Sequence, residues 1–544
     1  MEPQFPLLSA IIFLPSLGAV LAFLITSEDL VKRMALLTSA LTFLLSLLPF
    51  FMFDPSTAVM QFFEHYDWIP VLGISYEVGI DGISLLLIVL TTFLMPLTLL
   101  ASWDSIQARS REFVICMLFL ETGMIGVFAA VDLFLFYIFW EATLIPMYFL
   151  IGVWGGPRRI YAAVKFILYT MAGSLLMLVA ILALYFLYRQ ATGEATFNLF
   201  RLLELELPLS TQRWLFFAFF LAFAIKVPLF PFHTWLPDAH VEAPTPGSVL
   251  LAAILLKMGT YGFVRFCLPL FPEASIDATG IIALLAVVGI IYGALMALVQ
   301  VDIKKLVAYS SVSHLGFVVL GIFAINSQGL DGAVLQMVNH GLSTGALFLL
   351  VGMLYDRRHT RLIADFGGIT KVMPIFAAFF LVVSLSSIGL PGLNGFVGEF
   401  LALLGAFQAL PTLAVIAALG VILAAVYMLW MYQRVMFGEL THEDNRHLRD
   451  MNLREVVVLV PIVVVIVWIG LYPQPFLTRM EASTRAIVER VVTATQMHAA
   501  QTRMMRCMEM GHSGRHLTLP AHRINGLAPL SCRESRNVDP ETEG

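Results

Sequence analysis

The chain has 544 residues, of which 59% are hydrophobic and only 13% are charged. Soluble domains carry about 25% charged residues, so this composition excludes a soluble enzyme. The mean hydropathy of +0.87 agrees with that exclusion. The formal net charge of −5 is small for this length and indicates neither a nucleic-acid partner nor an acidic substrate. We therefore expect an all-α polytopic membrane protein.

The sequence contains no visible cofactor or metal motif. Its four cysteines, Cys116, Cys267, Cys507 and Cys532, lie far apart, so they indicate no iron–sulfur cluster, zinc site or disulfide framework. There is no phosphate-binding loop, no dinucleotide fingerprint and no paired metal-binding histidine motif. The first residues carry no positive segment, so the first apolar stretch is predicted to be a retained span.

Apolar windows predict about fourteen membrane spans, each needing about 20 residues. In chain order they are 5–25, 34–52, 81–102, 113–131, 133–152, 162–188, 214–232, 246–270, 276–299, 303–325, 333–355, 372–408, 411–433 and 456–473. The span at 372–408 is too long for one straight helix. Up to the last span, sixteen lysines and arginines fall in the connections on one side and only Arg189, Arg201 and Arg213 on the other. The positive-inside rule therefore places the N-terminus outside.

The C-terminal region differs from the rest of the chain. The stretch 476–493 is amphipathic and is predicted to lie along the membrane surface. From about Ala494 the sequence becomes polar and rich in arginine, and its periodicity disappears. We expect a disordered tail there.

Several ionisable residues lie inside the predicted spans, where each costs at least about 2.5–3.5 kcal/mol at the bilayer centre. They occupy seven different spans and are Glu141, Lys165, Lys226, Lys257, His314, His340 and Glu399. A single residue of this kind is as easily explained by a structural ion pair that fixes helix register. A row through seven spans favours a path for protons or ions instead.

Two of these charges adjoin sequences that break helices. Lys226 stands before Pro228 and Pro231, and Glu399 follows a segment with Pro391 and four glycines. Irregular backbone survives at membrane depth only where it is buried or lines a water-filled cavity. Two interrupted spans with adjoining opposite charges predict an inverted-repeat transporter.

The stretch 232–246 lies between the two breaks and is dense in titratable groups. It adds His233, Asp238 and His240 as candidates, at a position that the span map puts at an inner mouth. A simple polar loop is the equally weighted alternative.

Proton chemistry suits these residue types. A lysine that gains and loses a carboxylate partner can take up and release a proton near neutral pH. Glu141 and Lys226 form the candidate pair, because a lysine beside a helix break can move. His314 and His340 suit a relay along a hydrated path. We expect Lys257 to be a central relay and Glu399 the terminal site, which has no obvious partner other than Lys257.

An ordered set of motifs between about residues 75 and 475 resembles one family. They are Gly-Ile-Asp-Gly-Ile-Ser at 79–84, Phe-Trp-Glu at 139–141, Lys-Val-Pro-Leu-Phe-Pro-Phe-His-Thr-Trp-Leu-Pro-Asp-Ala-His at 226–240, Leu-Lys-Met-Gly at 256–259, Tyr-Ser-Ser-Val-Ser-His-Leu-Gly at 309–316 and Gly-Phe-Val-Gly-Glu-Phe at 395–400. The chain resembles the antiporter-like subunit M family of proton-pumping NADH:quinone oxidoreductase, respiratory complex I, equivalent to subunit 4 of mitochondria.

The resemblance implies fourteen helices with two inverted five-helix repeats, each containing a broken helix. It implies that the modulating glutamate is Glu141 and the pumping lysine Lys226, with Lys257, His314, His340 and Glu399 in the roles given above. Lys165 matches a further family lysine. The expected division is 1–110 for N-terminal helices, 111–272 and 273–434 for the repeats (broken near 226–237 and 388–398), 435–475 for the last span, and 476–544 for the amphipathic stretch and tail.

The resemblance also implies partners and a location. FMN, the iron–sulfur clusters and most of the quinone site are expected in partner subunits, which include neighbouring antiporter-like subunits, and this chain is expected to carry no cofactor. A bacterial inner membrane is the expected location, with an organellar inner membrane as the alternative. The competing functions are a subunit of a multi-subunit cation/proton antiporter or of a membrane-bound hydrogenase, and a structural membrane scaffold.

Overall fold

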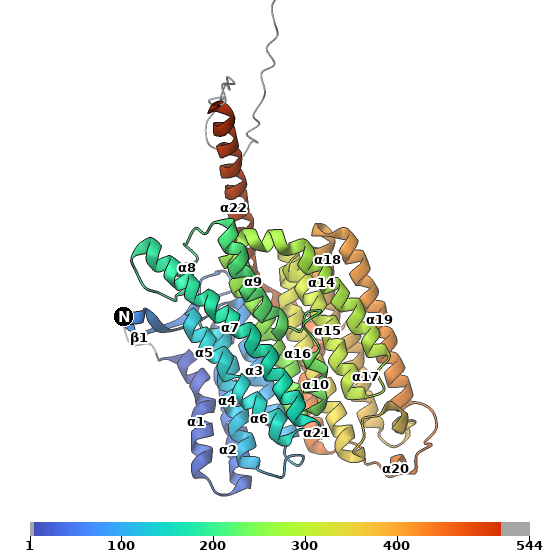
Figure 1. The fold of residues 1–544 in the computed structure, drawn as a ribbon. Coiled ribbons are helices and arrows are strands. Elements are labelled where there is room, and N and C mark those ends of the chain that lie inside the picture. Colours follow the sequence, from blue (N-terminus) through green and yellow to red (C-terminus); the bar gives the residue numbers. More distant parts are fainter. Residues whose placement is uncertain (1–4, 513–544) are drawn as a thin grey trace, which may run out of the picture.

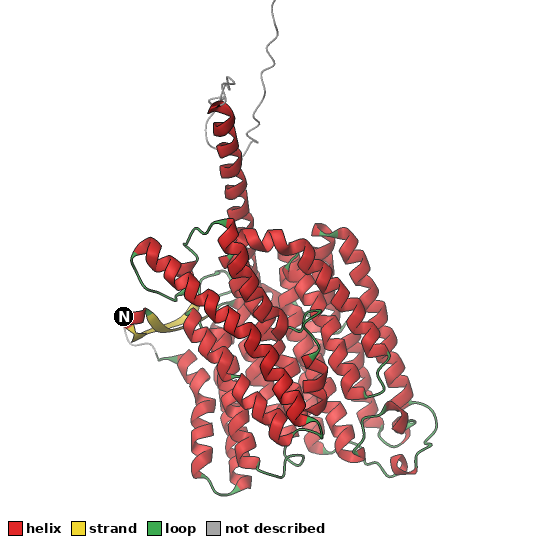
Figure 2. Ribbon diagram, in the orientation of Figure 1, coloured by secondary structure: helices red, strands yellow, loops and turns green. Residues whose placement is uncertain are grey.

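The computed structural model describes residues 5–512, with side chains described up to residue 496. Helices standing side by side form nearly the whole structure (Figures 1 and 2). Twelve helical stretches within the described residues are long and apolar enough to cross a membrane. The predicted all-α, multi-span fold is confirmed.

Ten of these stretches are simple crossings, and each coincides with a predicted span. They are α1 (Leu7–Leu24), α2 (Glu28–Met52), α3 (Gly82–Ala101), α4 (Ser110–Ala129), α7 (Arg159–Thr192), α14 (Pro272–Leu298), α15 (Ile303–Ile322), α16 (Ser327–Arg358), α19 (Pro411–Met436) and α21 (Leu453–Leu471).

The other two stretches are continuous helical paths with local irregularities. One joins α5 (Leu133–Ala142) to α6 (Leu144–Trp154). The other joins α11 (Thr245–Leu250), α12 (Leu256–Gly262) and α13 (Leu268–Leu270) through two π-helical turns, η2 (Leu251–Leu255) and η3 (Phe263–Cys267). Such π-helical turns frequently mark functional positions.

The two remaining predicted spans are broken helices. The first consists of α9 (Leu209–Lys226) and α10 (Trp235–Glu242), and the second of α17 (Pro374–Ile388) and α18 (Asn394–Ala409). In the second break Gly389 and Gly392 have φ angles of +84° and +94°, a backbone region that favours glycine. Together with the twelve long stretches, these two broken helices occupy, within the described residues, all fourteen places at which the sequence predicts a span.

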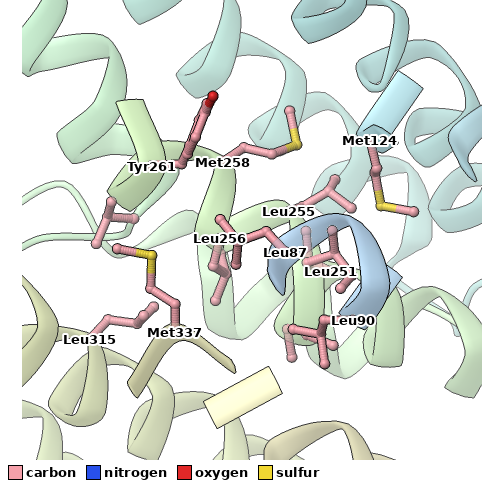
Figure 3. Packing of buried hydrophobic residues seen from close by; sticks show 14 of the residues in the cluster. Leu87, Leu90, Met124, Leu251, Leu255, Leu256, Met258, Tyr261, Leu315 and Met337 are labelled. Atoms are coloured by element: carbon pink, nitrogen blue, oxygen red, sulfur yellow. The ribbon is translucent and has the colours of Figure 1, made fainter. Parts of the chain in front are cut away.

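The most enclosed crossings are 245–270 and α16, whose apolar windows are fully buried. Leu251 and Leu255 of η2 lie near Leu87 of α3 and Met124 of α4, while Met337 of α16 lies on the other side of α12 (Figure 3). Small residues allow close approach, as membrane helices require. A Cβ added to Gly332 of α16, for example, would lie 2.2 Å from the Ala402 backbone nitrogen of α18. Lys257 and His340 therefore sit on the two innermost crossings.

A short antiparallel hairpin was not predicted from the sequence. It consists of β1 (Gln61–Ile69) and β2 (Ile74–Ile80), joined by the 3-10 turn η1 (Pro70–Leu72). Its Glu64 carboxylate accepts a hydrogen bond from Leu8 N at 2.7 Å and so caps the first turn of α1. The segment is too short for a span, and apolar windows alone do not detect strands.

Helix α22 (Gln474–His512) begins where the amphipathic stretch was predicted. Its first half holds four other elements together: Ser483 Oγ accepts from Gly82 N at 3.2 Å, and Thr484 Oγ1 donates to Asp331 Oδ1 at 2.5 Å. Arg479 Nε reaches Phe50 O at 3.3 Å and Arg490 Nε reaches Pro269 O at 2.9 Å.

The same helix then leaves the bundle at the upper edge of Figure 1. The expectation of a disordered tail from about Ala494 differs from the structure up to His512, where the backbone is helical. The remainder of that expectation concerns residues 513–544, which lie outside the described residues.

Asp132 lies next to the hairpin and caps α5, accepting from Phe134 N and Leu135 N at 2.9 Å each. Burial raises the pKa of this carboxyl to about 7, and the nearby Glu77 carboxylate adds to the rise. Because the folded-state pKa lies above the unfolded value, the protonated carboxyl is the stable form in the fold. The fold is therefore destabilised as the pH rises from about 4 towards 7.

We predict that Asp132→Asn, which keeps the cap and cannot ionise, removes this pH dependence. The thermal stability of the wild-type complex in detergent is expected to fall between about pH 4 and about pH 7, and that of the variant to fall less. Equal slopes for the two proteins would contradict the assignment.

Candidate proton-transfer site

Lys226 is the last residue of α9, directly before the first break, and it is 1% exposed. Its ammonium nitrogen lies 5.1 Å from the centre of the Trp140 ring and 5.8 Å from that of Phe166. It has no hydrogen-bond partner in the described part of the chain. The lysine is thus held by aromatic faces rather than by a carboxylate.

Glu141 lies on α5 beside Lys226 and is partly exposed. The two groups act on each other electrostatically, but Glu141 Oε1 has no hydrogen-bond partner among the described residues, as is the case for Lys226 Nζ. The structure therefore brings the predicted pair together without bonding it.

Lys165 of α7 bonds across to the other side of the break. Its ammonium donates to Asp238 Oδ2 at 2.7 Å and to Thr234 O at 2.9 Å. Tyr169, one turn further along α7, bonds to the Thr234 hydroxyl at 2.8 Å. This contact ties α7 to the start of α10.

The two histidines of the 232–246 stretch lie in different surroundings. His233 is buried and packs against the rings of Phe230 and Tyr292, at centroid distances of 5.6 and 5.0 Å. His240 is 0% exposed and stacks on Phe348 of α16 at 4.6 Å. Neither ring nitrogen of His240 has a hydrogen-bond partner in the described structure.

Lys257 is fully buried on α12. Its ammonium nitrogen lies 2.6 Å from Ala252 O and 2.6 Å from His340 Nδ1. Ala252 belongs to the π-helical turn η2, and its carbonyl lies five residues before the lysine. The irregular backbone thus supplies an acceptor to a cation that has no carboxylate bonded to it.

His314 of α15 bonds through Nδ1 to Glu399 Oε1 at 2.7 Å, and both side chains are buried. Glu399 Oε1 also accepts from Gln336 Nε2 at 2.9 Å. The other histidine nitrogen lies 3.2 Å from the Tyr427 hydroxyl. The sequence offered no partner for Glu399 other than Lys257, and the structure gives it His314 and Gln336 instead.

Both histidines, whose ring centres are 6.0 Å apart, line a small cavity formed mostly by residues with polar side chains. Its volume of about 10 Å³ suits one water molecule. It is lined by His314, Gln336, Asn339, His340, Ser343, Thr344, Ser386, Ser387 and Gly395. The cavity joins the Lys257–His340 contact to the His314–Glu399 contact.

Most of this polar lining was missed from the sequence. Gln336, Asn339, His340 and Ser343 recur at helical spacing and share one face of α16. Asn339 Nδ2 also donates to Asn394 O at 2.7 Å, at the start of α18. A search for polar residues on the same helix face as His340 would have found them.

No group of three or more histidine, cysteine, aspartate or glutamate side chains arranged for a metal ion occurs in the part of the chain that the structure describes.

Twelve long apolar crossings and two broken helices in the described part of the chain, with ionisable groups at their centre, define an antiporter-like membrane subunit. Residues 130–446 match the family described as NADH:quinone oxidoreductase/Mrp antiporter, transmembrane, and residues 10–126 match NADH-ubiquinone oxidoreductase chain 4, amino terminus. The chain belongs to this family of membrane subunits of NADH:quinone oxidoreductase.

Individual relatives are similar in sequence to this chain over almost their whole length. The chain is 50% identical to NADH-quinone oxidoreductase subunit M of Rhodobacter capsulatus over 481 residues, 86% of this chain and 93% of that one. It is 46% identical to NADH-ubiquinone oxidoreductase chain 4 of Marchantia polymorpha, covering 90% of this chain and 98% of the other.

Solved structures show the same fold. A chain of respiratory complex I from Thermus thermophilus with bound NADH superposes with a TM-score of 0.82 at 34% identity, covering 89% of this chain and 99% of that chain. A chain of the Mrp complex from Dietzia sp. DQ12-45-1b gives 0.75 at 20% identity, covering the same shares, which shows the fold alone.

We predict that Gln336→Leu lowers coupled turnover because Glu399 loses one of its two hydrogen-bond donors. A hydrogen bond to a charged group contributes about 1.5–3 kcal/mol, which corresponds to a loss of roughly tenfold or more. NADH–quinone turnover in membranes measures the effect, after a native gel has confirmed assembly. The same change at the exposed Gln408 is the control, and equal turnover of both variants would contradict the role of Gln336.

Proposed function

We propose that this chain is the proton-translocating membrane subunit of NADH:quinone oxidoreductase and that its buried charged residues carry the protons. The transfer groups are Glu141, Lys226, Lys257, His314, His340 and Glu399. Lys165, His233, Asp238 and His240 serve the region around the first break. The two repeats, 111–272 and 273–434, each contribute one broken helix to this path.

The observation that carries the proposal is a run of polar contacts that leads from the end of the first repeat into the second, with one small cavity between the two histidines. It leads from Lys257 to His340 at 2.6 Å, across the one-water cavity, and from His314 to Glu399 at 2.7 Å. A purely structural set of ion pairs would place a carboxylate on each lysine, yet Lys257 bonds to a carbonyl and an imidazole. Such neighbours suit a group that gives up and regains its proton.

Proton movement along this run needs only ordinary acid–base steps. Lys257 as an ammonium donates to His340 Nδ1, and the imidazole releases a proton from its other nitrogen towards the cavity. A water there accepts it and passes it to His314, from which Glu399 receives it. Tyr427 and Gln336 hold the histidine and the carboxylate in place.

The Glu141–Lys226 pair is proposed to set when Lys226 holds its proton and when it releases it. Bringing a carboxylate to about 4 Å of an ammonium is worth roughly 4 kcal/mol at an effective dielectric of 20. Lys226 stands unpaired beside Glu141, next to a break that lets it move. Closing this pair therefore strongly favours the protonated lysine, and opening it favours release.

Electron transfer belongs to partner subunits in this proposal. NADH oxidation, FMN, the iron–sulfur clusters and most of the quinone site lie there, and neighbouring antiporter-like subunits contact this chain in the membrane. Relatives named as subunits of NADH oxidoreductases at 45–50% identity support this assignment over an independent antiporter. The bacterial relatives support an inner (plasma) membrane location.

We predict that Lys257→Met stops proton pumping by this chain and slows coupled NADH–quinone turnover by roughly tenfold or more, because one acid–base group of the run is removed. Turnover and pH-gradient formation are measured in the same membranes. Lys371→Met, at an exposed lysine outside the site, is the matched control. Normal pumping in the Lys257 variant would contradict the proposed run.

A further inference from the structure

The C-terminal end of α10 is fixed by residues from three other parts of the chain. Three consecutive carbonyl groups, those of the last two residues of α10 and of its C-cap, are bonded: Val241 O accepts from Arg361 Nη1 at 2.7 Å, Glu242 O from Gly156 N at 2.8 Å, and Ala243 O from Lys304 Nζ at 2.5 Å. Two of the donors are side-chain cations of the second half. The end of the first broken helix is therefore tied to the second half of the molecule.

Lys304 is the unexpected member of this set. It is the second residue of α15, at the inner end of that helix, and it is only 7% exposed. The charged groups that act on its ammonium are Arg361, Asp302, Glu242 and Asp356. Asp302 pairs with Arg361 at 3.2 Å, and both are partly open to solvent. The buried Lys304 thus lies close to the partly exposed Asp302–Arg361 ion pair at the inner surface.

His240 lies deeper, at the end of α10. Both Lys304 and Lys257 act on its ring electrostatically, so the histidine lies within electrostatic reach of the inner-surface lysine and of the central lysine. Its two nitrogens have no hydrogen-bond partner in the described structure, and the ring is held by stacking on Phe348. An unpartnered, fully buried imidazole can accept a proton on one nitrogen and release one from the other.

We infer that Lys304 is the group through which protons enter the central run from the inner side, passing them by way of His240 to Lys257. This inference rests on the proposed function, because it supplies the run that begins at Lys257. In each cycle the neutral Lys304 amine takes a proton from inner water. The resulting ammonium gives it to the His240 imidazole, which delivers a proton to the Lys257 amine. Lys304 and His240 return to their neutral forms, so no other reactant is needed.

The bond to Ala243 gives Lys304 a second, structural action, which the test must separate from proton transfer. Arginine at position 304 can still donate to the carbonyl, but a guanidinium does not release its proton in proteins. Methionine removes both the donor and the exchangeable proton while keeping an unbranched apolar chain. Lys305, the next residue, is a matched control because it is less buried and lies outside the proposed path.

The experiment measures proton uptake and NADH–quinone turnover in membranes carrying Lys304→Met, Lys304→Arg or Lys305→Met, each after a native gel has confirmed assembly. We expect both Lys304 variants to lose roughly tenfold or more of coupled pumping and Lys305→Met to lose none. Restoration of pumping by arginine would show that Lys304 acts only as a tether and would overturn the inference.

A comparison with Lys257→Met distinguishes the two possible failures. If Lys257→Met stops pumping and both Lys304 variants pump normally, the proposed run stands and the inner-side route is wrong. If none of these variants affects pumping, the proposed function itself fails. Should Lys304→Met not assemble, the arginine variant alone decides, because it retains the donor to Ala243.

Discussion

The cost of placing ionisable groups inside a membrane governs the arrangement of this structure. Each such group costs at least about 2.5–3.5 kcal/mol at the bilayer centre unless the protein itself provides polar neighbours. The central groups Lys257 and His340 therefore lie on the two crossings whose apolar windows are fully buried, whereas only 33–39% of the windows of α1, α2, α19 and α21 is buried. The outer helices separate the charged interior from lipid.

Irregular backbone supplies much of the polar surroundings that these groups need. The π-helical turn η2 presents the Ala252 carbonyl to Lys257, and the break before α18 brings Asn394 to Asn339. The break after α9 leaves Lys226 at a helix end, between aromatic rings. These departures from regular helix lie where the proposed acid–base groups lie, as expected for sites that favour solvated charge over ideal hydrogen bonding.

The sequence predicted the crossings well, because twenty-residue apolar windows are strong signals. It did not predict pairings. His314 rather than Lys257 holds Glu399, and Glu141 and Lys226 lie near each other unbonded. Such contacts depend on how helices rotate and cross, and apolar windows do not report this. The hairpin and the four contacts of α22 were missed for a similar reason, since they depend on partners far away in the sequence.

The most direct test of the central claim is Lys226→Ala in the assembled complex. NADH–quinone turnover and pH-gradient formation are recorded together in native membranes, with Lys371→Ala as control and assembly verified by native gel. If the charged row moves protons coupled to electron transfer, both activities fall in the Lys226 variant and stay normal in the control. Wild-type turnover and pumping in the Lys226 variant would mean that the charges are structural, and the account would be wrong.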